Sequence, residues 1–94
     1  GMNGALKSRQ ILANAEGVLG IELIAAAQAL DFRDFGFGTG TRAAHAAVRE
    51  VVHHLDIDRP LFADHNAMAA AVARCNVLDA VERAVGPLRT AWRA

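Results

Sequence analysis

The first third of the chain carries apolar residues at helical spacing, and no proline interrupts the pattern from Asn3 to Phe32. A helix of about thirty residues spans roughly 40–45 Å at 1.5 Å per residue. A compact body of this chain length has a diameter of roughly 30 Å. The predicted helix is therefore longer than the domain that contains it, which suggests a piece of a larger helical assembly.

The apolar surface of this helix is wider than one short partner helix would cover. One stripe at near-heptad spacing consists of Leu12, Leu19, Leu23, Ala26 and Leu30, and a second side of Ile11, Ala15, Val18, Ile21 and Ile24. Gly17 and Gly20 lie one turn apart, and each costs up to roughly 1 kcal/mol relative to alanine. Close crossing by another helix would explain them; drift in a tolerant helix is the alternative.

An apolar surface of this kind predicts an oligomer interface on the first helix. The candidate interface residues are Leu12, Gly17, Leu19, Gly20, Leu23, Ile24 and Leu30.

Three shorter helices are predicted after the long one, so that the fold class is all-α in a single domain, 1–94. Residues 31–34 end the first helix, and a glycine-rich loop follows at 35–40. The second helix is expected from an N-cap at Thr39 or Thr41 to Leu55, the third from an N-cap at Asp64 to Arg74, and the fourth, capped by Asn76, from Val77 to Val85.

Inward-facing positions follow from the spacing of these helices. They are Ala44, Ala47, Val48, Val51 and Leu55 in the second helix, and Ala67, Met68, Ala71 and Val72 in the third. Gly86-Pro87 ends the fourth helix, and residues 88–94 are expected to be frayed, although Trp92 could dock. Gly1 before Met2 is interpreted as the remnant of a cleaved tag.

Composition narrows the class of partner. Ten basic and ten acidic residues balance, which argues against nucleic acid or an anionic membrane as the main partner. The longest apolar stretch, Val18 to Leu30, contains Glu22 and is too short to cross a bilayer. Cys75 is the only cysteine and cannot form an internal disulfide, so we expect a soluble protein of the reducing cytoplasm.

Two patterns suggest ligand binding and neither predicts it well. The loop Gly36 to Gly40 is glycine-rich, but a helix precedes it and no Gly-Lys-Ser/Thr follows, so a connector is favoured. Adjacent His53 and His54 point about 100° apart on a helix, and His45 lies two turns from His53. These side chains, with His65, are therefore interpreted as solvated histidines on helix surfaces, and no metal site is predicted.

Nucleophiles and carboxylates give no catalytic constellation either. Cys75 has no neighbouring histidine and is interpreted as a small buried hydrophobe at a helix junction. Ser8, the only serine, lacks a Gly-x-Ser-x-Gly motif. Glu22 is either the polar edge of the apolar stripe, which is favoured, or a buried carboxylate paired with an arginine. No catalytic residue is assigned.

Several stretches taken together resemble the C-terminal part of histidine ammonia-lyases and their aromatic amino-acid lyase relatives. They are Leu6–Asn14 (LKSRQILAN), Gly17–Leu23 (GVLGIEL), Ala26–Arg33 (AAQALDFR), Gly38–Thr41 (GTGT), Ala44–Arg49 (AHAAVR) and Leu55–Leu61 (LDIDRPL). The resemblance runs in order from Leu6 to Leu88, and it is carried by the order and spacing of the segments rather than by any one of them.

The resemblance implies an all-helical homotetramer that eliminates ammonia from histidine or aromatic amino acids. The family's electrophile, a methylidene-imidazolone, forms from an internal Ala-Ser-Gly, and its catalysis uses tyrosines. This chain has no Ala-Ser-Gly and no tyrosine. No catalytic residue carries over, and we expect no cofactor, since the methylidene-imidazolone cannot form from this chain.

Two hypotheses follow from the sequence. In the first, the chain is a truncated lyase-like domain without activity, which forms a homo-oligomer through its first helix. In the second, it is one subunit of a split ammonia-lyase that another, catalytic chain completes. A regulatory binding module is a third and weaker hypothesis, because it rests on the apolar face alone.

Overall fold

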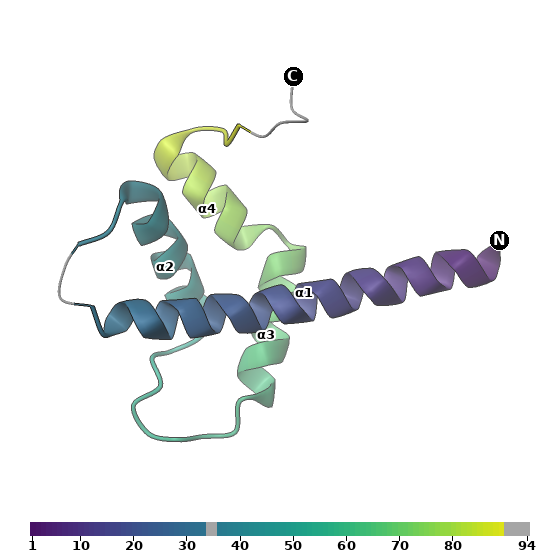
Figure 1. The fold of residues 1–94 in the computed structure, drawn as a ribbon, viewed down its shortest axis with the longest axis horizontal. Helices are drawn as coiled ribbons and strands as arrows, with labels where there is room; N and C mark the ends of the chain where they lie inside the picture. The colour runs from purple at the N-terminus through teal and green to yellow at the C-terminus, as the bar shows by residue number, and fades with distance from the viewer. Residues whose placement is uncertain (34–35, 90–94) are drawn as a thin grey trace.

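The computed structural model describes residues 1–33 and 36–89, and all of its regular structure there is helical (Figure 1). The helices are α1 (Met2–Asp31), α2 (Thr39–Val51), α3 (Phe62–Ala73) and α4 (Asn76–Val85). The predicted all-α class and the order of one long and three shorter helices are confirmed. Trp92 and the other residues of 90–94, part of the segment expected to be frayed, lie outside the described residues.

The long first helix extends well beyond the body formed by the others (Figure 1). The chain measures 52 × 41 × 17 Å along its principal axes, with a radius of gyration of 15.2 Å. A compact chain of this length has a radius of roughly 12 Å. Residues 1–15 are all exposed, so the N-terminal half of α1 projects without tertiary support from this chain.

The small core lies where α3 crosses the middle of α1 and where α2 closes over them (Figure 1). Its buried residues are Ala27, Val48, Val52, Met68 and Ala71, with Leu23, Ile24, Val51, Val72 and Val77 packed around them. The inward positions predicted for α2 and α3 are mostly confirmed, although Ala67 is exposed. Alanine is common in this core, so the helices approach closely but bury few large side chains.

Gly20 lies where α3 packs closely against α1. A Cβ at this position would lie 3.0 Å from the backbone nitrogen of Ala69 and 3.3 Å from the carbonyl carbon of Met68. A glycine lets α3 cross α1 at this distance without crowding its backbone, as the sequence predicted. The prediction fails for Gly17, where nothing lies within 4 Å of the corresponding Cβ position.

The predicted end of α2 was wrong by one turn. The helix stops at Val51 rather than Leu55, because Val52 adopts an extended conformation with φ −129° and ψ 122°. The side-chain amide of Gln28 then donates to the carbonyl of Leu55 at 3.0 Å and accepts from its N–H at 3.1 Å. A side chain of α1 thus replaces the helical hydrogen bonds that Leu55 would otherwise make.

The predicted N-caps were also wrong. Gly38 caps α2 in an extended conformation, Leu61 precedes α3, and neither makes a side-chain cap hydrogen bond. Asp64 lies inside the first turn of α3, where its carboxylate accepts from Arg59 Nη2 at 3.0 Å and Nε at 3.2 Å. The ion pair with Arg59 occupies the carboxylate that was expected to cap the helix.

Cys75 was predicted to be buried, and this was wrong. Its thiol is exposed, and its backbone adopts the left-handed conformation with φ 59° between α3 and α4. This residue separates α3 from α4, and Asn76 becomes the first residue of α4 instead of its cap.

Candidate functional site

The predicted interface residues divide into two groups along α1. Gly20 is buried against α3, Leu23 and Ile24 pack against the core, and Leu30 is half-buried. Leu12 remains 60% exposed and Leu19 48% exposed. The fold therefore uses the C-terminal part of the candidate set internally and leaves its N-terminal part uncovered.

The uncovered part belongs to a larger apolar surface on the projecting half of α1. The large exposed apolar side chains from Met2 to Ile21 are Met2, Leu6, Ile11, Leu12, Val18, Leu19 and Ile21. Isolated apolar residues on a surface are ordinary, but seven large exposed apolar side chains within twenty residues of one helix, spread around its circumference, are typical of a helix that packs against partners.

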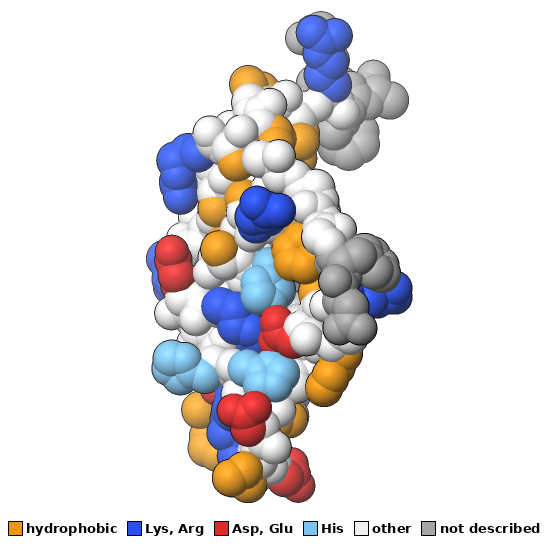
Figure 2. Space-filling model, turned by 90° about the vertical axis from the view of Figure 1, so that its left-hand side faces the viewer, with side chains coloured by type: hydrophobic (Ala, Val, Ile, Leu, Met, Phe, Trp, Pro, Cys, Tyr) orange, Lys and Arg blue, Asp and Glu red, His pale blue; other side chains and the backbone are white. Residues whose placement is uncertain are grey.

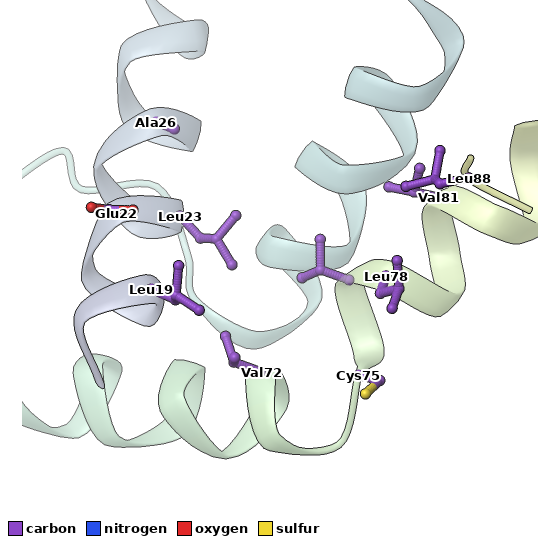
Figure 3. Close-up of a pocket in the computed structure, with 10 residues that line it drawn as sticks. Leu19, Glu22, Leu23, Ala26, Val72, Cys75, Leu78, Val81 and Leu88 are labelled. Carbon is purple, nitrogen blue, oxygen red and sulfur yellow. The ribbon is translucent and has the colours of Figure 1, made fainter. Parts of the chain in front are cut away.

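An apolar groove continues this surface into the body of the molecule. It lies between α1 and α4 and encloses about 590 Å³. Its lining residues are Leu19, Glu22, Leu23, Ala26, Val72, Cys75, Val77, Leu78, Val81 and Leu88. Figure 3 shows Leu19 and Leu23 of α1 pointing toward the space between the two helices, while the carboxylate of Glu22 points away from α4. The groove thus offers aliphatic walls with a charge at its edge.

A polar cluster at the other end of α1 was not predicted from the sequence. Asp31, the last residue of α1, accepts from His45 Nε2 at 2.6 Å, from Arg49 Nη2 at 2.5 Å and from His54 Nδ1 at 2.5 Å. His45 and Arg49 come from α2, and His54 comes from the connector that follows it. Figure 2, which views this end of the molecule, shows histidine, arginine and acidic side chains gathered on one face.

Further hydrogen bonds extend the cluster into the body. Arg49 also donates to the carbonyl of Val52 at 3.0 Å and to the side-chain oxygen of Gln28 at 3.4 Å. Arg59 donates to the carbonyl of His53 at 2.9 Å and to that of His54 at 3.4 Å. The network ties the end of α1 to α2 and to the connector 52–61.

The electrostatics of Asp31 reflect its three partners. Partial burial alone would raise the pKa of its carboxyl group, but hydrogen bonds from His54, Arg49 and His45, together with the charge of Arg49, outweigh burial. The pKa of Asp31 is therefore held well below its usual range. A carboxylate that is ionised and fully occupied by donors is suited to hold helices together rather than to accept a proton from a substrate.

The cluster corrects the interpretation of two histidines. His45 and His54 were expected to be solvated helix-surface side chains, yet both bond to Asp31, while His53 is exposed. Their rings also contact phenylalanines, with ring centroids 5.8 Å apart for Phe37–His45 and 6.1 Å for Phe32–His54. Among the described residues, no group of three or more His, Cys, Asp or Glu side chains is arranged to hold a metal ion.

Comparison with known proteins identifies the family of this chain. The family model for aromatic amino acid lyases matches residues 1–50, more than half of the chain. The chain belongs to the aromatic amino acid lyase family. Its predicted resemblance to this family is thereby confirmed.

Curated relatives point to one branch of the family. Histidine ammonia-lyases from Alkaliphilus metalliredigens and Symbiobacterium thermophilum are 43% and 46% identical to the chain over 89 residues, and that from Sorangium cellulosum is 45% identical over 89 residues. Each alignment covers 94% of this chain but only 17–18% of the relative. The chain thus spans less than a fifth of the length of these relatives. No solved structure matches it.

One further property of α1 bears on its environment. By length and composition α1 could cross a membrane, which the sequence argument from Val18–Leu30 did not anticipate. One such helix is weak evidence, since the buried core helix of a soluble protein and a signal sequence near the N-terminus have the same length and composition.

Proposed function

We propose that this chain is a structural, oligomerising segment of the histidine ammonia-lyase type, without catalytic activity of its own. The observation that carries the proposal is the set of uncovered large apolar side chains on the projecting half of α1, where Ile11 is 67% and Leu12 60% exposed. Burying each such side chain contributes roughly 1.5–3 kcal/mol. The expected partner is a second copy of the chain.

The composition supports an inactive segment with a protein partner. The chain lacks the Ala-Ser-Gly that the family resemblance requires for its electrophile, and it has no tyrosine. Its neutral charge balance favours a protein partner over nucleic acid or an anionic membrane. The unpaired, exposed thiol of Cys75 fits the reducing cytoplasm, where we place the protein.

Sedimentation velocity at tens of micromolar tests the self-association. We expect a dimer or larger species for the wild-type chain, and a monomer for the double substitution Leu12→Glu and Leu19→Glu, which places charges on the exposed face. The matched control is Gln10→Glu with Arg42→Glu, which changes charge at two exposed positions outside this face and should preserve the oligomer. A wild-type chain that sediments as a monomer would contradict the proposal.

A second candidate function is that of a subunit in a split ammonia-lyase. The alignment favours it, because the chain matches only 17–18% of each histidine ammonia-lyase and so corresponds to one part of such an enzyme. Co-expression with a lyase chain that carries Ala-Ser-Gly but lacks the region matched here should then convert histidine to urocanate, seen by its ultraviolet absorbance. No absorbance from a folded, co-purifying complex would exclude this function.

A further inference from the structure

The groove and the projecting half of α1 lie on one continuous face of the helix. At about 100° per residue, Leu19, Leu23 and Ala26 of the groove share a face with positions 4, 5, 8, 12 and 15. Towards the N-terminus this face is built from Gly4, Ala5 and Ser8, all of which are exposed. One end of the face is therefore flat and the other end carries large aliphatic side chains.

The two ends are complementary in size when a second α1 runs antiparallel to the first. A two-fold axis between residues 13 and 14 places Leu12 opposite Ala15 and Leu19 opposite Ser8. The same register brings Gly4 of one copy to Leu23 of the other. Each large side chain meets a small one, which permits close packing of the two helices.

The charges on α1 select the same direction. Lys7 and Arg9 lie on opposite flanks of this face. Further along the helix, Glu16 lies on the flank of Arg9 and Glu22 on the flank of Lys7. In an antiparallel pair, equivalent flanks of the two helices are adjacent. Arg9 of one copy therefore lies on the same side as Glu16 of the other, and Lys7 on the same side as Glu22. The two residues of each pair are offset by about two positions along the axis. A parallel pair would bring bases next to bases and acids next to acids.

We propose that a second copy of this chain fills the groove through antiparallel pairing of the two α1 helices. The first turns of the partner's α1, at positions 4–8, then lie against Leu19 and Leu23 and beside Leu78 of α4. The pair is isologous, so each copy contributes one groove and one projecting helix. This inference rests on the proposed self-association and adds its direction and register.

Disulfide trapping tests the register. In a Cys75→Ala background, chains carrying Ser8→Cys and chains carrying Leu19→Cys are mixed in equal amounts and oxidised. We expect the mixed Ser8–Leu19 disulfide as the main product by mass spectrometry, and little product from Ser8→Cys alone, because its two copies would lie about 16 Å apart along the axis. Gln10→Cys, on the opposite face, is the matched control and should not cross-link to Leu19→Cys.

The outcomes separate this inference from the proposed function. A predominant Ser8–Ser8 disulfide would show a parallel pair and overturn the inference. So would a dimer in sedimentation that gives no Ser8–Leu19 disulfide, since another face or another register would then form it; in both cases the self-association itself stands. A monomer in the Cys75→Ala background would instead contradict the proposed function.

Charge exchange provides an independent measurement of direction. Arg9→Glu should weaken the dimer roughly two- to tenfold at low salt, because it places like charges side by side at two symmetric positions. Adding Glu16→Arg should restore the wild-type dissociation constant. If the double substitution weakens the dimer further than the single one, Arg9 does not face Glu16 and the antiparallel register is wrong.

Discussion

The two halves of α1 form one continuous helix but differ in what supports them. Residues 20–31 are fixed by a crossing helix at Gly20, by the core at Ala27 and by the ionic cluster at Asp31. Residues 2–15 are exposed throughout and have only their own helical hydrogen bonds. Isolated helices shorter than about 12–15 residues are marginal in water. The comparison shows that the C-terminal half makes the fold, whereas the N-terminal half has no support from this chain; the proposed partner would supply it.

The largest effect is expected from removing the core side chain that α1 packs on. Met68 is fully buried, and Met68→Ala should lower the free energy of unfolding by about 2–4 kcal/mol through lost contacts and a cavity. Urea denaturation at a fixed protein concentration measures this. A loss below about 1 kcal/mol would mean that the small core does not hold the C-terminal half in place.

The ionic cluster should come next in magnitude. Asp31→Asn removes the charge that three donors share and should cost about 2 kcal/mol. Asp56→Asn is the control, since the Asp56 side chain is 83% exposed and lies 3.3 Å from His54 Nε2. Equal losses of unfolding free energy for both variants would show that the Asp31 cluster stabilises the fold no more than an exposed ion pair does.

The pH dependence of the same variant has a definite sign. The folded-state pKa of Asp31 lies below its unfolded value of about 3.9, so its stabilisation is present above the unfolded pKa and is lost as pH falls through the folded pKa. The difference between wild type and Asp31→Asn in denaturation experiments should therefore shrink as the solution is acidified below about pH 4. A constant difference would contradict the lowered pKa.

The two glycines of α1 give a matched pair with opposite expected signs. Gly17→Ala should stabilise the chain by about 0.5–1 kcal/mol, because alanine favours the helix and its Cβ meets nothing within 4 Å. Gly20→Ala should destabilise it by about 1 kcal/mol, because its Cβ meets the backbone of Ala69 at 3.0 Å. Thermal unfolding of both variants compares them, and the same sign for both would show that α3 can move aside.

The smallest effect on monomer stability is expected at the projecting end. Leu12→Ala should change the free energy of unfolding by less than about 0.5 kcal/mol at a concentration where the chain is monomeric, since Leu12 makes no core contact. The same variant should weaken self-association. A large loss in the monomer would mean that the projecting half is packed on the body in solution.

The sequence was sufficient to predict the helices and part of the core, because these depend on local signals. Gly86-Pro87 ends α4 as predicted, and Val48, Met68 and Ala71 are buried where their spacing requires. The Asp31 cluster was missed because its members come from α1, α2 and the connector, and His45 and His54 were judged only against neighbours in one helix. Gln28 was a usable signal of this polar network, because it is a side-chain amide on the inner side of an apolar stretch.

The reactivity of the Cys75 thiol should report whether the groove is occupied. Its exposed thiol lies on a left-handed residue at the junction of α3 and α4 and lines the groove. A thiol reagent should therefore react more slowly as the chain is concentrated and the groove fills. The native protein carries its own reporter of occupancy, which can be followed by reaction rate without a label or a substitution.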